Sequence, residues 1–158
     1  SDIVFIFAGS GADRKRVEEI VREKDLTNVR LIPRQPKEVM PRLWSLCDLT
    51  LVPLRNSPVF SSVIPSKIFE SMGMGVPIII SVPAGEAVDI VLASNAGVAV
   101  PPDDPVAMAQ EIARLADDRK MLAEFKAAAA AAAAQYSRSA QAERMLGIIA
   151  KYSKCSTV

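Results

Sequence analysis

The amino-acid sequence predicts a three-layer α/β domain with five mostly parallel strands. Three observations support this prediction: short apolar runs alternate with helical stretches, a glycine-rich turn follows the first run, and 158 residues suit one domain with a sizeable core. The order strand, glycine turn, helix is the usual start of a doubly wound unit. We expect one domain over residues 1–152 and a frayed tail over residues 153–158.

The predicted elements follow the alternation that a doubly wound sheet requires. Strands are expected over residues 3–7, 29–32, 47–53, 76–80 and 97–100, where short apolar runs occur. Helices are expected over residues 13–24, 37–46, 105–115, 119–135 and 139–151, with short ones after Pro65 and after Gly85. Asp103 or Asp104 is expected to cap the helix that begins at Pro105.

Composition excludes several classes of function. Hydrophobic residues make up 50% of the chain and charged residues 23%, which is typical of a folded globular protein. The net charge of +1 gives no reason to expect nucleic acid as a partner. The chain has no histidine, which excludes a histidine base, a Ser-His-Asp triad and a histidine metal site within it. We expect neither a metal nor a cofactor.

The sequence also predicts where the domain resides. No apolar run reaches the length of a membrane span, and no signal peptide opens the chain. Cys47 and Cys155 lack metal-binding or redox spacing, which fits a reducing compartment. We therefore expect a cytoplasmic domain.

Two loops that follow predicted strands hold candidate ligand-binding residues. Arg34 follows the second strand, and Ser61 and Ser62 follow the third. Open α/β sheets bind ligands at this edge, beyond the carboxyl ends of the strands. Arg34 can stack on a base or reach a phosphate, or it can be an ordinary exposed arginine. The two serines can contact a ligand or form turns, and the residues alone leave these alternatives open.

The main candidate site lies within residues 64–80. Pro65 and Ser66 are typical of a helix start, where free amides attract an anion such as phosphate. Ser66, Lys67 and Glu70 share one helix face because Glu70 follows the other two by four and three residues. A nucleotide diphosphate would use such a set, with cation and amides on the phosphates and the carboxylate on the ribose hydroxyls. The alternative is an ordinary surface Lys–Glu pair.

Over residues 65–77 the chain reads Pro-Ser-Lys-Ile-Phe-Glu-Ser-Met-Gly-Met-Gly-Val-Pro. This segment resembles the nucleotide-binding segment of retaining GT-B glycosyltransferases. Bacterial polysaccharide and lipopolysaccharide transferases are the most similar group. The resemblance covers nearly the whole chain and implies a Rossmann-like C-terminal domain, an incomplete half of a GT-B fold cut from a longer parent. Glu70 matches the family's ribose-binding glutamate. A first glutamate, usually near the donor sugar, falls at Ser62, where this sequence departs from the pattern.

The resemblance implies a function for the chain. It would bind the nucleotide end of a UDP- or GDP-sugar, as the donor domain of an enzyme that transfers a sugar to a saccharide or lipid-linked acceptor. The isolated chain would be inactive. No catalytic residue is assigned; the implied nucleotide-sugar-binding residues are Arg34, Ser61, Ser62, Ser66, Lys67 and Glu70. Gly85 and Glu86 fall where the family borders the donor site, although Glu86 can equally stabilise a helix N-terminus.

The resemblance also implies partners and alternatives. The parent would supply an N-terminal domain and would act at the inner face of the membrane. The family's first strand lies at the centre of the sheet and has no counterpart here, so unpaired edges would favour a dimer. Two other functions stay open: a sugar-nucleotide epimerase with the same fold, and a non-catalytic α/β interaction module.

Overall fold

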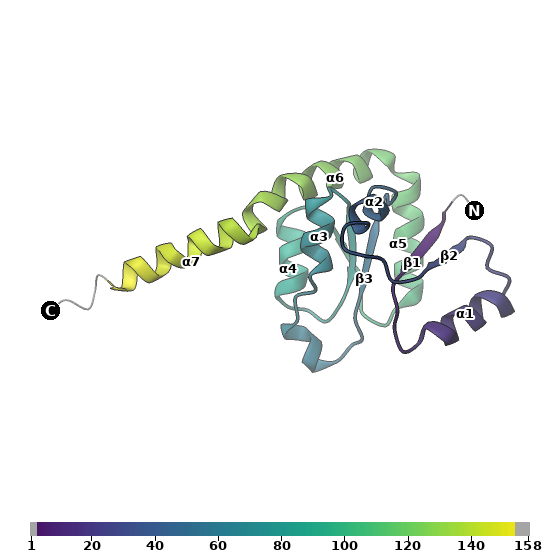
Figure 1. The fold of residues 1–158 in the computed structure, drawn as a ribbon. Coiled ribbons are helices and arrows are strands. Elements are labelled where there is room, and N and C mark those ends of the chain that lie inside the picture. The colour runs from purple at the N-terminus through teal and green to yellow at the C-terminus, as the bar shows by residue number, and fades with distance from the viewer. Residues whose placement is uncertain (1–2, 154–158) are drawn as a thin grey trace. The chain divides into compact units, whose positions relative to one another are not determined.

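The computed structural model describes residues 3–153, in which five strands and seven α-helices alternate (Figure 1). All three strand pairings are parallel, as the sequence predicted. The strands form two sheets, one of two strands and one of three. The chain divides between Leu43 and Trp44 into two compact units, each of which contains one of these sheets.

The first unit is a single strand–helix–strand motif. Strands β1 (Phe5–Ala8) and β2 (Val29–Ile32) pair in parallel, and helix α1 (Arg14–Glu23) connects them. The Arg14 guanidinium donates hydrogen bonds to the carbonyl oxygens of Gly9, at 2.6 Å, and Ile32, at 3.1 Å. This side chain therefore joins the carboxyl ends of both strands. Helix α2 (Met40–Trp44) spans the boundary between the units.

The second unit contains a three-stranded sheet with the order β3-β4-β5. Its strands are β3 (Thr50–Pro53), β4 (Ile78–Ser81) and β5 (Gly97–Ala99). Between them lie the 3₁₀ helix η1 (Pro58–Ser62), helix α3 (Lys67–Gly73) and helix α4 (Glu86–Ala93). After β5 come α5 (Pro105–Asp117), α6 (Arg119–Ala133), the 3₁₀ turn η2 (Ala134–Tyr136) and α7 (Arg138–Ser153).

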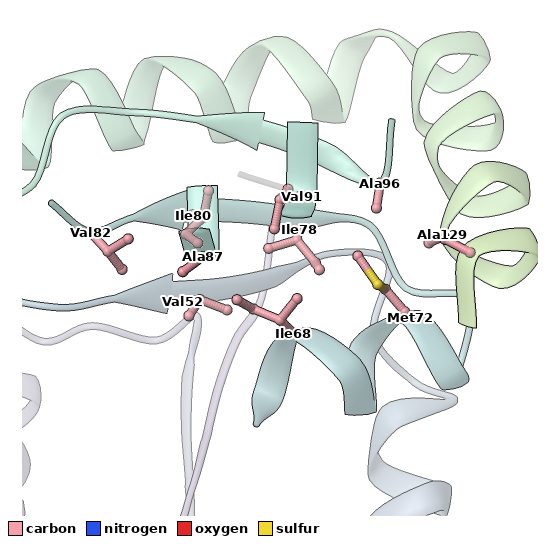
Figure 2. Packing of buried hydrophobic residues seen from close by; sticks show 11 residues of the cluster. Val52, Ile68, Met72, Ile78, Ile80, Val82, Ala87, Val91, Ala96 and Ala129 are labelled. Carbon is pink, nitrogen blue, oxygen red and sulfur yellow. The ribbon is translucent and has the colours of Figure 1, made fainter. Parts of the chain in front are cut away.

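The core of this unit forms on both faces of β4. Ile78 and Ile80 pack in one cluster with Ile68 and Met72 of α3 and with α4, as Figure 2 shows. Ile79 points to the other face and packs with Leu115, Leu122 and Phe125 of α5 and α6. Side chains of a strand alternate between its two faces, so the two clusters make the unit three-layered, as the sequence predicted.

Helix α3 ends in a glycine-dependent motif that turns the chain into β4. Gly75 has φ +61, a left-handed conformation that glycine adopts without steric cost. The amide of Gly75 donates to the Met72 carbonyl and that of Val76 to the Ser71 carbonyl, both at 2.9 Å, which is a Schellman motif. The buried Ser71 hydroxyl donates to the Val76 carbonyl at 2.8 Å and lies 3.0 Å from the Thr50 hydroxyl of β3.

Several element boundaries differ from the predictions. The helix expected over residues 37–46 covers only Met40–Trp44, and the strand expected from residue 47 begins at Thr50. The 3₁₀ helix η1 was not predicted. Of the expected tail, Ser153 belongs to α7, and residues 154–158 lie outside the described residues. The expectation of one domain over residues 1–152 stays a prediction.

The burial of β4 predicts the effect of truncating it. We expect Ile79→Ala to lower the free energy of unfolding by about 2–5 kcal/mol, because Ile79 is fully buried and its loss leaves a cavity. The control Leu92→Ala truncates a side chain on α4 that is 50% exposed, and should change the free energy by less than about 0.5 kcal/mol. Urea unfolding followed by circular dichroism measures both, and equal effects would contradict the assignment of the core.

Candidate functional site

The start of α3 brings together two of the predicted site residues. Ser66 occupies the N-cap position with helical dihedral angles, φ −57 and ψ −26, and its side chain caps no backbone amide. Its hydroxyl instead donates a hydrogen bond to Glu70 Oε1 at 3.1 Å. Helical dihedral angles at this position place Ser66 and Glu70 one turn apart on the same helix face, where the hydroxyl bonds the Glu70 side chain. An exposed carboxylate and a hydroxyl thus share one helix face.

Lys67 lies beside this pair and carries the positive charge of the site. Its side chain is exposed, and it forms no ion pair with any carboxylate in residues 3–153. Lys67 and Glu70 form no ion pair with each other among the described residues, and whether they bind a ligand or are ordinary surface charges stays a prediction. The ammonium is therefore available to an external anion, while one Glu70 oxygen accepts from Ser66.

The 3₁₀ helix η1 positions the other two serines of the predicted site, Ser61 and Ser62. The Ser61 hydroxyl donates to the Pro58 carbonyl at 2.7 Å, a local turn contact. Ser61 and Ser62 are both exposed. The segment follows the carboxyl end of β3 and leads directly into α3, so it lies at the edge where open α/β sheets bind ligands.

Arg34 belongs to the first unit, in the loop that follows β2. Its side chain is exposed, and the neighbouring Gln35 amide donates to the Pro33 carbonyl at 3.0 Å. Arg34 thus lies at the carboxyl end of a parallel strand, as expected. The structure places it within its own unit and leaves its role in a nucleotide site as a prediction.

The sequence patterns did not predict three contacts that the structure shows around the site. The amide of Asn56 donates to Asp103 Oδ2 at 2.7 Å, across 47 positions of the chain. Gly85, the N-cap residue of α4, lies directly against the carbonyl group of Ser61. The third contact is the Ser71–Thr50 pair beneath α3. No pattern in the sequence pairs residues so far apart, although Gly85 in a predicted ligand-binding loop was a signal of a close backbone approach.

A hollow lies at the same edge of the sheet, next to the start of α5. Its lining includes Arg55, Ser81, Asp103 and Met108. None of the six predicted site residues lines it. Asp104 lies at its rim, but Oδ1 of this residue accepts from the amides of α5 and so serves as the helix cap that the sequence predicted.

Three further features bear on function among the described residues: metal-binding clusters, membrane-spanning helices and the thiol of Cys47. Residues 3–153 contain no cluster of three or more acidic, cysteine or histidine side chains that could hold a metal ion. Over the same residues, no helix is both long and apolar enough to cross a bilayer. Burial, and secondly the charge of Asp48, raises the pKa of the Cys47 thiol, which disfavours the nucleophilic thiolate.

The raised pKa predicts slow alkylation of Cys47. In a Cys155→Ser variant, we expect iodoacetamide to modify Cys47 more slowly in the folded chain than in the urea-unfolded chain at neutral pH. The rate should rise with pH through a midpoint above the ordinary pKa of a cysteine, because the neutral thiol is the form that burial favours. Mass spectrometry of timed samples measures both rates, and equal rates in the two states would contradict this prediction.

Comparisons with known proteins identify a family for the chain and solved structures with a similar fold. The family described as "Glycosyl transferases group 1" matches residues 1–132. A search of curated proteins found no match. Among solved structures, sucrose-phosphate synthase from Thermosynechococcus elongatus is 23% identical with a TM-score of 0.76, and the match covers 97% of this chain and 39% of that one.

Two further solved structures share the fold. HepE from Anabaena, in complex with UDP and glucose, is 19% identical with a TM-score of 0.77, and the match covers 96% of this chain and 41% of that one. A glycosyltransferase from Rickettsia africae is 18% identical with a TM-score of 0.74, and the match covers 93% and 39%. The chain thus spans about two fifths of the length of the structures that it matches.

Proposed function

Since the chain belongs to the group 1 glycosyl transferases, we propose that it binds the nucleotide end of a sugar nucleotide, as the donor domain of a longer enzyme. The observation that carries this proposal is the arrangement at the start of α3. There the Lys67 ammonium, which forms no ion pair within residues 3–153, shares a helix face with the exposed Glu70 carboxylate, and the Ser66 hydroxyl donates to that carboxylate. A sugar nucleotide carries a group for each of these side chains: a diphosphate for the ammonium and a ribose for the carboxylate.

Each side chain has a distinct role in this proposal. The Lys67 ammonium, with the backbone amide of Ser66, holds the diphosphate and offsets the charge of the departing nucleoside diphosphate. The Glu70 carboxylate accepts hydrogen bonds from the ribose hydroxyls, and the Ser66 hydroxyl orients that carboxylate. Ser61 and Ser62 lie toward the donor sugar, and Arg34 contacts the base or a phosphate. The presence of UDP in the Anabaena HepE structure supports a uridine nucleotide, and GDP is the alternative.

The complete reaction belongs to a larger protein in this proposal. A second domain supplies the acceptor site, and the enzyme transfers the sugar to a saccharide or lipid-linked acceptor of bacterial polysaccharide or lipopolysaccharide synthesis, in the cytoplasm at the inner face of the membrane. Two surfaces support the presence of a further partner. Strand β3 is an edge strand of its sheet, and on α7 the apolar side chains of Met145, Ile148, Ile149 and Tyr152 are at least half exposed. A dimer of this chain is the other partner that such surfaces would accept.

Two other functions predict different outcomes. A sugar-nucleotide epimerase of the same fold would also bind the nucleotide, but product analysis of the full-length protein would show an altered sugar rather than a transferred one. A non-catalytic interaction module would bind no nucleotide at all. Calorimetry of the chain with UDP and GDP therefore separates the third function from the first two.

The proposed roles predict separate effects at Glu70 and Lys67. In the full-length protein, Glu70→Ala should weaken UDP or GDP binding by about 1–3 kcal/mol, the usual range for a lost hydrogen bond to a charged group. Lys67→Ala should weaken binding of the diphosphate more than binding of the free nucleoside, because only the diphosphate carries the charge that an ammonium attracts. Isothermal titration calorimetry measures the affinity of the wild-type protein and of each variant for the nucleoside diphosphate and for the free nucleoside.

A matched control is available for Lys67. Lys126 is an exposed lysine of α6, and its carbonyl group lies near Gly75, at the far end of α3 from Lys67. Lys126→Ala should leave both affinities unchanged. An unchanged affinity in Glu70→Ala would exclude the ribose role, and equal losses for nucleoside and diphosphate in Lys67→Ala would exclude a phosphate contact.

We also expect that this chain alone transfers no sugar. One domain supplies only one wall of a cleft between two domains, so the acceptor is not oriented and the proximity contribution to catalysis is lost. The assay incubates the purified 158-residue chain with radiolabelled UDP- and GDP-sugars and a panel of lipid-linked acceptors. Transfer above the level of a Lys67→Ala, Glu70→Ala double variant would contradict this division of labour.

A further inference from the structure

The segment between β3 and α3 is held at two points by residues far away in the sequence. At its start, the Asn56 amide donates to Asp103 Oδ2 at 2.7 Å. At its end, η1 packs on the N-terminus of α4, where Gly85 lies against Ser61. Both contacts use backbone groups of the segment, so they fix its path whatever its exposed side chains do.

The contact at Gly85 leaves no room for a side chain. A Cβ atom added to Gly85 would overlap the Ser61 carbonyl oxygen and lie 3.4 Å from the Ser61 carbonyl carbon. Gly85 itself cannot retreat, because its carbonyl accepts the Val88 amide at 3.0 Å and the Asp89 amide at 3.2 Å as the first bonds of α4. Ala87 and Val91 anchor that helix in the core, at 3% and 0% exposure. A larger residue at position 85 must therefore shift the Ser61 carbonyl of η1 or change the backbone of residue 85, whose φ is +159.

The contact at Asp103 is also specific. Asp103 has φ +58, a left-handed conformation that aspartate tolerates and most residues avoid. Its neighbour Asp104 caps α5 through Oδ1, which fixes the start of that helix. The Asp103 carboxylate thus extends from an immobilised turn to the backbone of Asn56.

We propose that Gly85 and Asp103 are positioning residues that fix η1 relative to α3, and thereby set how the site discriminates the sugar of a sugar nucleotide from its nucleotide. This inference rests on the proposed function. The proposed contacts of Lys67 and Glu70 with the diphosphate and the ribose lie at the start of α3, which its own buried residues Ile68 and Met72 anchor. In the proposed function the sugar end lies toward Ser61 and Ser62 of η1, and the position of η1 depends on the contacts with Gly85 and Asp103. Loosening η1 therefore changes affinity for the sugar nucleotide while affinity for the free nucleotide is kept.

The test uses Gly85→Ala with a control at another glycine. Gly73, in α3, has no atom within 4 Å of where a Cβ would lie, so Gly73→Ala adds the same methyl group without displacing a described residue. Hydrogen exchange is followed at the amides of Phe60 and Val63, which bond within and after η1, and at Val76 in the core. We expect Gly85→Ala to speed exchange at least tenfold at Phe60 and Val63 but not at Val76, and Gly73→Ala to change none of them.

Binding is measured on the same variants with UDP and UDP-glucose, and with GDP and GDP-mannose in parallel. In Gly85→Ala we expect the ratio of the Kd of the sugar nucleotide to the Kd of the free nucleotide to change at least fivefold, with the free nucleotide bound within twofold of the wild-type affinity. A merely structural defect would weaken both ligands equally and leave the ratio unchanged. That result, or unchanged exchange at Phe60 and Val63, would overturn the inference.

If Gly85→Ala does not fold, a second variant, Asp103→Gly, tests the inference in its place. Asp103→Gly removes the acceptor of the Asn56 amide, inserts no atom, and suits the left-handed backbone at position 103. We expect faster exchange at Asn56 and a change of the Kd ratio, and unchanged values of both would overturn the inference. If the wild-type chain binds none of the four ligands, the proposed function fails, while the exchange data still show whether the two residues position η1.

Discussion

Strand β4 is buried on both of its faces, and its burial requires a layer of helices on each face in the second unit. Ile78, Ile79 and Ile80 are all fully buried. Burying one such side chain contributes about 1.5–3 kcal/mol relative to leaving it in water. No single layer can cover both faces of a strand. Helices α3 and α4 pack on one face, with Ala129 and Ala132 of α6, while α5 packs on the other face with Leu122 and Phe125 of α6.

This arrangement explains why the candidate site lies at the start of α3. Ile68 and Met72 fix the inner face of the helix in the core, which leaves Ser66, Lys67 and Glu70 on its outer face. The Ser66–Glu70 hydrogen bond is exposed, and side-chain pairs at this helical spacing contribute about 0.2–0.5 kcal/mol to stability, so the fold does not require it. A site on a rigid helix, made of side chains that the fold does not need, is well placed for binding.

The connections around the sheet restrict the site further. The Schellman motif at Gly75 and the Ser71–Thr50 pair close the turn from α3 into β4. Before α3, the position of η1 is restricted by Gly85, the N-cap residue of α4, which lies against the Ser61 carbonyl. The helix therefore has a fixed position at its end, while the segment before it takes its position from a distant part of the chain.

The sequence by itself determined the order of strands and helices, the end of α3 and the residues of its outer face. Apolar runs, turn glycines and helix-start residues act over a few neighbouring positions, and such local patterns are visible in a sequence. Only the tertiary structure decided that the five strands form two sheets, that the Ser66 hydroxyl bonds Glu70, and that Gly85 and Asp103 hold the segment before α3. The sheets and the two tethers join groups that are distant in the sequence but adjacent in space, and the Ser66 bond depends on backbone dihedral angles at the N-cap. No local pattern in the sequence specifies these long-range contacts or the dihedral angles at the N-cap.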